Sequence, residues 1–130
     1  MIIELDLESE TPIYLQLKQQ IIEGIALGEL EPGEPLPSVR ALASDLGINM
    51  HTVNKAYQLL KQDGYILIHR QKGVVIHPDG MPEADETFNA HIKNGLKPLI
   101  TESMCRHMDE KDFLQMCQAV FEELRGKGQA

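Results

Sequence analysis

Hydrophobic residues recur at a helical spacing over most of the chain and at a strand-like spacing near its middle. The first helical pattern begins at Thr11-Pro12, where threonine is the expected N-cap and proline takes the first helical position, and it ends at Gly28. Its apolar positions are Tyr14, Leu17, Ile21 and Ile25. Residues 28–37 hold three prolines, which predicts an extended connection to the next helix.

Two shorter helical patterns follow, separated only by the turn Gly47-Ile48-Asn49. Ser38 is the expected N-cap of the first and Asn49 of the second, while Gly47 and Gly64 are the expected stops. The apolar positions are Leu42 and Leu46 in the first helix and Val53, Ala56, Tyr57 and Leu60 in the second. This arrangement is typical of a helix-turn-helix, whose second helix is sized to lie in the major groove of DNA.

A β-hairpin is predicted directly after these helices. Residues with high strand propensity fill Tyr65–His69 and Val74–His77, and the polar tip Arg70-Gln71-Lys72-Gly73 joins them. A hairpin in this position is the wing of a winged helix-turn-helix, which we assign to residues 1–77.

Prolines, a glycine and acidic residues make residues 78–83 the expected linker, so that residues 84–130 form a separate tail. Two helices are predicted in the tail. Gly95 and Pro98 should kink or split the first, and Asp109 should cap the second. The predicted fold class is therefore mainly α, with a small β-hairpin wing and a C-terminal α-helical tail.

Both tail helices carry an apolar stripe that a pair of helices cannot bury alone. The stripe positions are Phe88, Ile92, Leu96, Leu99 and Ile100 in the first helix and Phe113, Cys117, Val120, Phe121 and Leu124 in the second. Packing against the same helices of a second copy would remove this surface from water, so we predict a homodimer formed through these residues. The alternative is a monomer whose tail folds back on its own winged domain.

The formal net charge of −8 argues against a nucleic-acid partner until the charges are located along the chain. Residues 1–35 sum to −7 and residues 78–130 to −4, whereas residues 36–77 sum to +3. The predicted helix-turn-helix and wing thus form a basic island in an acidic protein. This distribution favours DNA as the partner of that region.

The remaining composition excludes several classes of protein. Neither a signal peptide nor an apolar run long enough to span a membrane is visible, so we expect a cytoplasmic location. Cys105 and Cys117 are too few for a disulfide framework and are expected to be reduced thiols. The sequence has no phosphate-binding glycine loop, metal-protease helix or nucleophile elbow, so we predict neither an enzyme nor a bound cofactor.

The stretch LPSVRALASDLGINMHTVNKAYQLLKQDGYI, followed by the strand GVVI, resembles the DNA-binding region of the GntR family of bacterial transcription regulators. The similarity covers about residues 10–77 and includes the connection GELEPGEPLP. It implies DNA contacts from the start of the second helix, from the recognition helix and from the wing tip. Arg40 is the best candidate for a guanine or phosphate contact, because its planar fork pairs with two acceptors at once.

The predicted DNA-binding set combines this resemblance with the outward positions of the recognition helix, which are rich in hydrogen-bonding groups. Its members are Ser38, Arg40, Asn49, Met50, His51, Thr52, Asn54, Lys55, Arg70, Gln71, Lys72 and Gly73. Three positions depart from the usual family pattern: Val39 replaces a glutamate, Met50 a basic residue and Gln71 a glycine. The sequence preference of another member therefore cannot be transferred to this chain.

The short tail resembles that of the YtrA subfamily. The resemblance implies a repressor that binds a double-stranded DNA operator as a homodimer, and this subfamily is often linked to transporter operons. Two recognition helices related by a two-fold axis would contact an inverted repeat, with half-sites about 34 Å apart. If a small-molecule effector exists, we expect it at the junction of linker and tail, near Tyr14, Phe88 and Ile92.

Two other functions compete with this interpretation. The winged helix could be a protein-interaction module, although the basic island and Arg40 favour DNA. A metal-responsive regulator could use Cys105, His107 and Cys117, together with His91. Their spacing matches no recognised ligand pattern, so no metal site is predicted.

Overall fold

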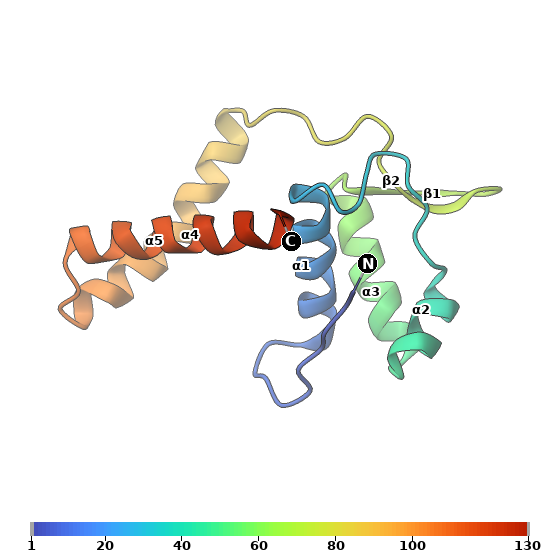
Figure 1. Ribbon diagram of the computed structural model, residues 1–130, viewed down its shortest axis with the longest axis horizontal. Helices are drawn as coiled ribbons and strands as arrows, with labels where there is room; N and C mark the ends of the chain where they lie inside the picture. Colours follow the sequence, from blue (N-terminus) through green and yellow to red (C-terminus); the bar gives the residue numbers. More distant parts are fainter. Residues whose placement is uncertain (1, 130) are drawn as a thin grey trace. The chain divides into compact units, whose positions relative to one another are not determined.

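The computed structural model describes residues 2–129, and it places the side chains of residues 2–127 (Figure 1). The helices and strands are α1 (Ile13–Ala26), α2 (Val39–Leu46), α3 (Met50–Gln62), β1 (Ile66–His69), β2 (Gly73–Ile76), α4 (Glu86–Cys105) and α5 (Glu110–Gln129). This mainly helical fold with one antiparallel hairpin confirms the predicted fold class. The chain divides into two compact units, Met1–Met81 and Pro82–Ala130.

Capping side chains fix where α2 and α3 begin. The Ser38 hydroxyl accepts a hydrogen bond from the Ala41 amide at 3.0 Å, and the Asn49 side chain accepts one from the His51 amide at 2.7 Å. Gly47 ends α2 in a left-handed conformation, with φ 67° and ψ 34°, which glycine adopts without steric cost. Both predicted caps and this stop are confirmed.

The predicted cap of the first helix is wrong by one residue. Pro12, not Thr11, precedes the first helical residue, and its carbonyl accepts hydrogen bonds from the Leu15 and Gln16 amides at 3.1 Å each. The carbonyl of Thr11 instead accepts a hydrogen bond from the Gln16 side chain at 2.8 Å. Thr11 is therefore held outside the helix by a side chain that the sequence pattern did not identify.

The core of the first unit lies between α1, α3 and the hairpin. Leu17 and Ile21 of α1 are fully buried against the predicted inner face of α3, whose members are Val53, Ala56, Tyr57 and Leu60. Ile66 and Ile76, which pair across β1 and β2, close the core at the hairpin. Each large aliphatic side chain buried here contributes roughly 1.5–3 kcal/mol. The predicted inner face of α3 is confirmed in full.

The connection before α2 pairs with the hairpin as a third extended segment. The Gly33 amide donates to the Ile76 carbonyl at 2.9 Å, and the Leu36 amide donates to the Val74 carbonyl at 2.8 Å. An isolated bridge joins Pro35 to Val75 between them. The predicted extended conformation is therefore present, and its backbone groups are satisfied by β2.

Two glutamines of α1 hold the N-terminal residues in an extended conformation. The Gln20 side chain both accepts from the Glu4 amide, at 2.9 Å, and donates to the Glu4 carbonyl. The Gln16 side chain does the same with Asp6, at 2.9 Å for each bond. Residues four apart on a helix are separated by ~6 Å, close to the ~6.6 Å between alternate strand residues. The side-chain amides of Gln16 and Gln20 are therefore spaced so that they can bind alternate residues of the extended segment.

Replacing Gln16 and Gln20 together by alanine should release this segment. The doubly substituted protein should lose roughly 1–2 kcal/mol of stability, since the bonds are partly exposed to water. Hydrogen exchange of the Glu4 and Asp6 amides should become as fast as in an unstructured peptide. Gln19→Ala is the control, because Gln19 is exposed on the same helix, and unchanged protection in the double variant would contradict the prediction.

In the second unit, α4 is a single helix that includes Pro98. Of the two predicted outcomes at Gly95 and Pro98, the split is therefore wrong, whereas the kink stays a prediction. A proline removes one backbone hydrogen bond and its ring clashes with the carbonyl four residues before it, which can bend a helix without ending it. The Thr101 hydroxyl donates to the Pro98 carbonyl at 3.0 Å in the following turn. The carboxylate of Asp109 accepts from the Asp112 amide at 2.8 Å, which confirms the predicted cap of α5. Within residues 2–129, none of the helices is both long and apolar enough to cross a membrane.

Candidate nucleic-acid interface

The exposed side chains of the first turns of α3 form the first part of the candidate interface. Met50 is 44% exposed, His51 and Asn54 are also exposed, and Thr52 is half-buried. Val53 lies between them in sequence and is fully buried, so the helix presents its polar positions away from the core. These side chains offer donors and acceptors of the kind that pair with base edges in the major groove.

The side chain of Lys55, on the same helix, lies toward α1. Its ammonium nitrogen is 3.9 Å from the centre of the Tyr14 ring, which belongs to α1. A cation over an aromatic face at an exposed site is stabilised by about 0.5–1 kcal/mol. The side chain therefore turns toward α1, and a DNA contact from Lys55 stays a prediction.

Arg40 is exposed in the first turn of α2, two residues after the Ser38 cap. Among the described residues, the structure gives it no carboxylate partner within salt-bridge distance. The ion pair that does form joins Lys18 to Asp63 at 3.1 Å, which offsets one of the acidic groups of this unit. The Arg40 guanidinium is thus available for an external acceptor.

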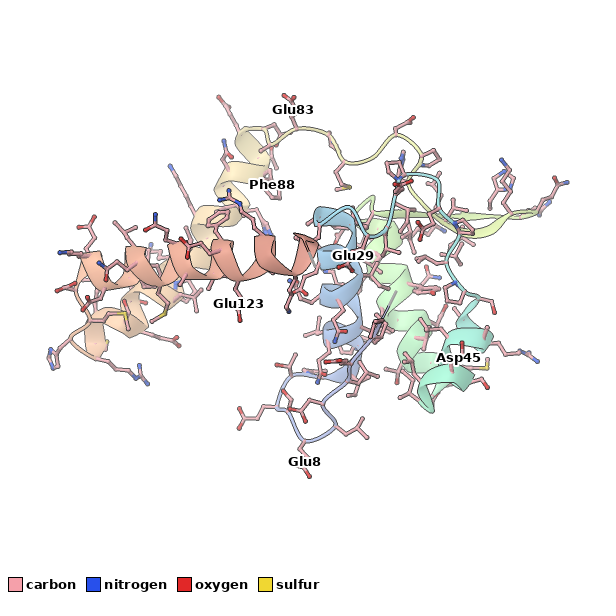
Figure 2. The ribbon with its side chains drawn as sticks, in the orientation of Figure 1. Glu8, Glu29, Asp45, Glu83, Phe88 and Glu123 are labelled. Carbon is pink, nitrogen blue, oxygen red and sulfur yellow. The ribbon has the colours of Figure 1, made fainter. Side chains whose placement is uncertain are left out.

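The hairpin tip places Arg70, Gln71 and Lys72 in solvent between β1 and β2. Figure 2 shows side chains with nitrogen at their ends projecting from this tip. The imidazole Nδ1 of His69 accepts from the amides of Gln71 and Lys72, at 3.3 and 3.4 Å, which shapes the turn. Gly73 closes it with φ 74°, a conformation that a side chain would disfavour.

These parts converge on one side of the first unit. Figure 1 shows α2 and the hairpin tip on the side of α3 that faces away from α1. Asp45 is the acidic residue of α2, and Figure 2 places its side chain on that helix. The start of α2, the first turns of α3 and the hairpin tip therefore give a surface with basic and hydrogen-bonding groups.

The second unit exposes apolar side chains along both of its helices. Phe88 and Ile92 of α4 are each 45% exposed, and Phe121 of α5 is 59% exposed. Figure 2 shows Phe88 close to the start of α4. The other residues predicted for dimerisation are also exposed or half-buried: Leu96, Leu99, Ile100, Phe113, Cys117, Val120 and Leu124. Such a surface is unusual for a chain that stays alone in water.

Part of this apolar surface lines a groove of about 570 Å³ between α4 and α5. All five predicted dimerisation residues of α5 and Leu99 of α4 line it, together with Met108 and Met116. Sequence reasoning missed these methionines, although Met116 lies three residues after Phe113 and four before Val120, a spacing that extends the same stripe. Their flexible side chains suit a surface that must fit a packing partner.

The residues considered as metal ligands do not assemble into a site. His107 lies in the turn between α4 and α5 with φ 63°, and Cys117 is half-buried in the groove. Over residues 2–129, no three His, Cys, Asp or Glu side chains are grouped closely enough to hold a metal ion.

A family model and one curated relative match the part of the chain that carries this interface. Residues 13–76, from α1 to β2, match the model described as bacterial regulatory proteins, gntR family. The HTH-type transcriptional repressor YtrA of Bacillus subtilis (strain 168) is 40% identical over 101 residues, which cover 78% of this chain and 78% of that protein.

Solved structures extend the similarity to the tail and to a DNA complex. YtrA from Sulfolobus acidocaldarius, a GntR-family transcription factor, is 45% identical with a TM-score of 0.62, and the match covers 81% of this chain and 99% of that one. A transcriptional antiterminator from Listeria monocytogenes EGD-e is 26% identical with a TM-score of 0.88, over 96% and 93% of the two chains. The AraR DNA-binding domain in complex with operator ORX1 is 27% identical with a TM-score of 0.50, over 56% and 90%.

Proposed function

The chain belongs to the GntR family of bacterial regulatory proteins, and from this premise we propose that it represses transcription as a homodimer bound to an inverted-repeat operator. It is a transcription regulator with a winged DNA-binding domain, and not an enzyme. The curated relative is a repressor, and the AraR domain was solved on an operator. Both support repression by occupation of DNA.

One observation carries the proposal. Within a single compact unit, α2 and the hairpin tip lie on the side of α3 that faces away from α1 (Figure 1), and Arg40, the hairpin tip and most of the polar side chains of the first turns of α3 are exposed. This is the arrangement that a recognition helix in the major groove and a wing on the adjacent backbone require. Asn54 and His51 are suited to base edges, and Arg70 and Lys72 to phosphates.

The homodimer is supported by the apolar surface of α4 and α5. Side chains such as Leu99 and Phe121, 56% and 59% exposed, would leave water if a second copy packed against them. A two-fold dimer of this kind would present two recognition helices to successive turns of one DNA face, about 34 Å apart. Two modest half-site affinities would then combine on one operator.

The function is tested by selecting duplexes from a random library with the purified full-length chain. We expect the selected sequences to contain an inverted repeat whose half-site centres are one helical turn apart. Native mass spectrometry of the complex should show two chains per duplex. A selected set with a single half-site, or one chain per duplex, would contradict the proposed dimer.

The positive charge of the wing should contribute to the affinity for DNA. Lys72→Ala should make the plot of log affinity against log salt less steep by about 1.8, since each of two subunits loses one phosphate contact. Binding isotherms on the selected duplex at four salt concentrations measure this slope. Lys61→Ala is the matched control, because it removes the same charge from the last turn of α3, and an equal change in both variants would refute the wing contact.

The regulated genes and signals are part of the same proposal. A transporter operon is the proposed target, because the sequence resembles the YtrA subfamily, and a cytoplasmic location is part of the proposal because a repressor must reach its operator. A small-molecule effector stays a prediction from the sequence.

A further inference from the structure

Tyr57 is a buried tyrosine of the recognition helix whose hydroxyl leaves that helix to bind the chain before α2. Its side chain is 0% exposed, and the hydroxyl donates to the Pro37 carbonyl at 2.7 Å. The hydroxyl is protonated at physiological pH even at the ordinary pKa of tyrosine, and burial raises that pKa further. Nonpolar packing alone does not require this oxygen.

The acceptor lies where two other parts of the DNA-binding unit meet. On one side of Pro37, the Leu36 amide donates to the Val74 carbonyl of β2 at 2.8 Å. On the other side, Ser38 caps α2 through the Ala41 amide at 3.0 Å. The Pro37 carbonyl is therefore bonded to the recognition helix, while its neighbours Leu36 and Ser38 are bonded to the wing strand and to the first turn of α2.

This junction sets the position of Arg40 relative to α3. Arg40 lies in the first turn of α2, two residues beyond the Ser38 cap, so a shift of Pro37 moves its guanidinium group with the helix start. Among the described residues, the Tyr57 hydroxyl makes the direct side-chain hydrogen bond from α3 to the start of α2. When two helices contact bases together, the position of one helix relative to the other must be fixed, because hydrogen bonds weaken steeply with misalignment.

We propose that Tyr57 is a positioning residue for operator recognition, whose hydroxyl holds the start of α2 against α3 and so keeps Arg40 in register with the recognition side chains. The inference rests on the proposed function, since it assigns a specificity role within the same DNA site. Tyr57 itself is fully buried and so offers no surface for a DNA contact. Its effect must therefore pass through Arg40.

A double-mutant cycle tests this dependence. Tyr57→Phe removes one oxygen and keeps the buried ring, and Arg40→Ala removes the group that is positioned. On the selected duplex, Tyr57→Phe should weaken binding about tenfold in the wild-type background and less than about twofold in the Arg40→Ala background. Affinity for a scrambled duplex should stay unchanged, because phosphate contacts tolerate small shifts.

Two controls separate positioning from stability. Ile21→Val thins the same core from α1, away from α2, and Tyr65→Phe removes a hydroxyl from a half-buried tyrosine. Both should leave the ratio of affinities for selected and scrambled duplexes unchanged. Should Tyr57→Phe unfold, the same cycle is run in sucrose, which favours the compact state.

The outcomes distinguish the two levels of the proposal. Equal losses from Tyr57→Phe in both backgrounds, or no loss in the wild-type background, would overturn the positioning role while leaving operator binding intact. A wild-type chain that binds the selected and scrambled duplexes equally would overturn the proposed function itself.

Discussion

Replacing Arg40 by alanine removes one contact from each subunit of the homodimer and should weaken binding to the operator by about 30-fold or more. The exposed guanidinium has no carboxylate partner among the described residues, so the substitution removes an external contact and leaves no buried charge unpaired. A bidentate contact to a base contributes roughly 1–3 kcal/mol of discrimination, and every 1.4 kcal/mol corresponds to a tenfold change. Fluorescence anisotropy on the selected duplex measures the loss.

The controls distinguish a base contact from a general loss of charge. Arg40→Lys keeps the charge but not the planar fork, so it should restore affinity for a scrambled duplex and not the preference for the operator. Lys61→Ala carries the same charge change at the far end of α3 and should have a small effect on both duplexes. Unchanged operator affinity in Arg40→Ala would show that recognition does not use this side chain, and would contradict the proposed contact.

Replacing Phe121 by glutamate should dissociate the homodimer. Phe121 is 59% exposed in a single chain and borders the groove between α4 and α5, so the change leaves the fold of one chain intact. In the dimer it would bury a carboxylate among apolar side chains, at a cost of several kcal/mol. The dimer dissociation constant should therefore rise by about a hundredfold or more, as sedimentation velocity over a concentration series would measure.

The matched control introduces the same charge on the opposite face of α5. Gln115 lies among polar neighbours such as Lys111 and Gln118, so Gln115→Glu should leave the dimer intact. Circular dichroism should show equal helix content in both variants. A Phe121→Glu chain that still sediments as a dimer, or a wild-type chain that is monomeric at micromolar concentration, would exclude the tail as the dimer interface.

Local signals in the sequence predicted the DNA-binding unit well. The caps Ser38 and Asn49 act on amides two or three residues away, so their effect depends little on the rest of the fold. The inner face of α3 follows from helical periodicity, which places Val53 and Tyr57 on one side. These local features are sufficient to predict the helix-turn-helix without knowledge of tertiary contacts.

Features that depend on tertiary contacts were not predicted. Lys55 has the exposure of a DNA-facing residue in a helical projection, yet the ring of Tyr14 attracts it from another helix. The same holds for Gln16 and Gln20, whose amides bind a segment that carries no strand pattern of its own. A long polar side chain can reach several charged or hydrogen-bonding partners, and the periodicity of the sequence does not indicate which partner it contacts.

In the tail, Pro98 was given too much weight as a helix breaker. One missing donor costs less than breaking the hydrogen bonds of the surrounding turns, so α4 continues through it. The groove between α4 and α5 also depends on how two helices are joined at the turn that contains His107. The apolar stripes in the sequence identified most of the residues that line the groove, whereas the shape of the groove is seen only in the structure.

Operator specificity is tested most directly by an anisotropy titration of the full-length chain on the selected duplex and on a scrambled duplex of the same composition, at about 50 and 200 mM salt. A sequence-specific repressor should bind the selected duplex at least about a thousandfold more tightly at the higher salt, with both affinities falling as salt rises. Equal affinities for the two duplexes at both salt concentrations would contradict operator recognition by this protein.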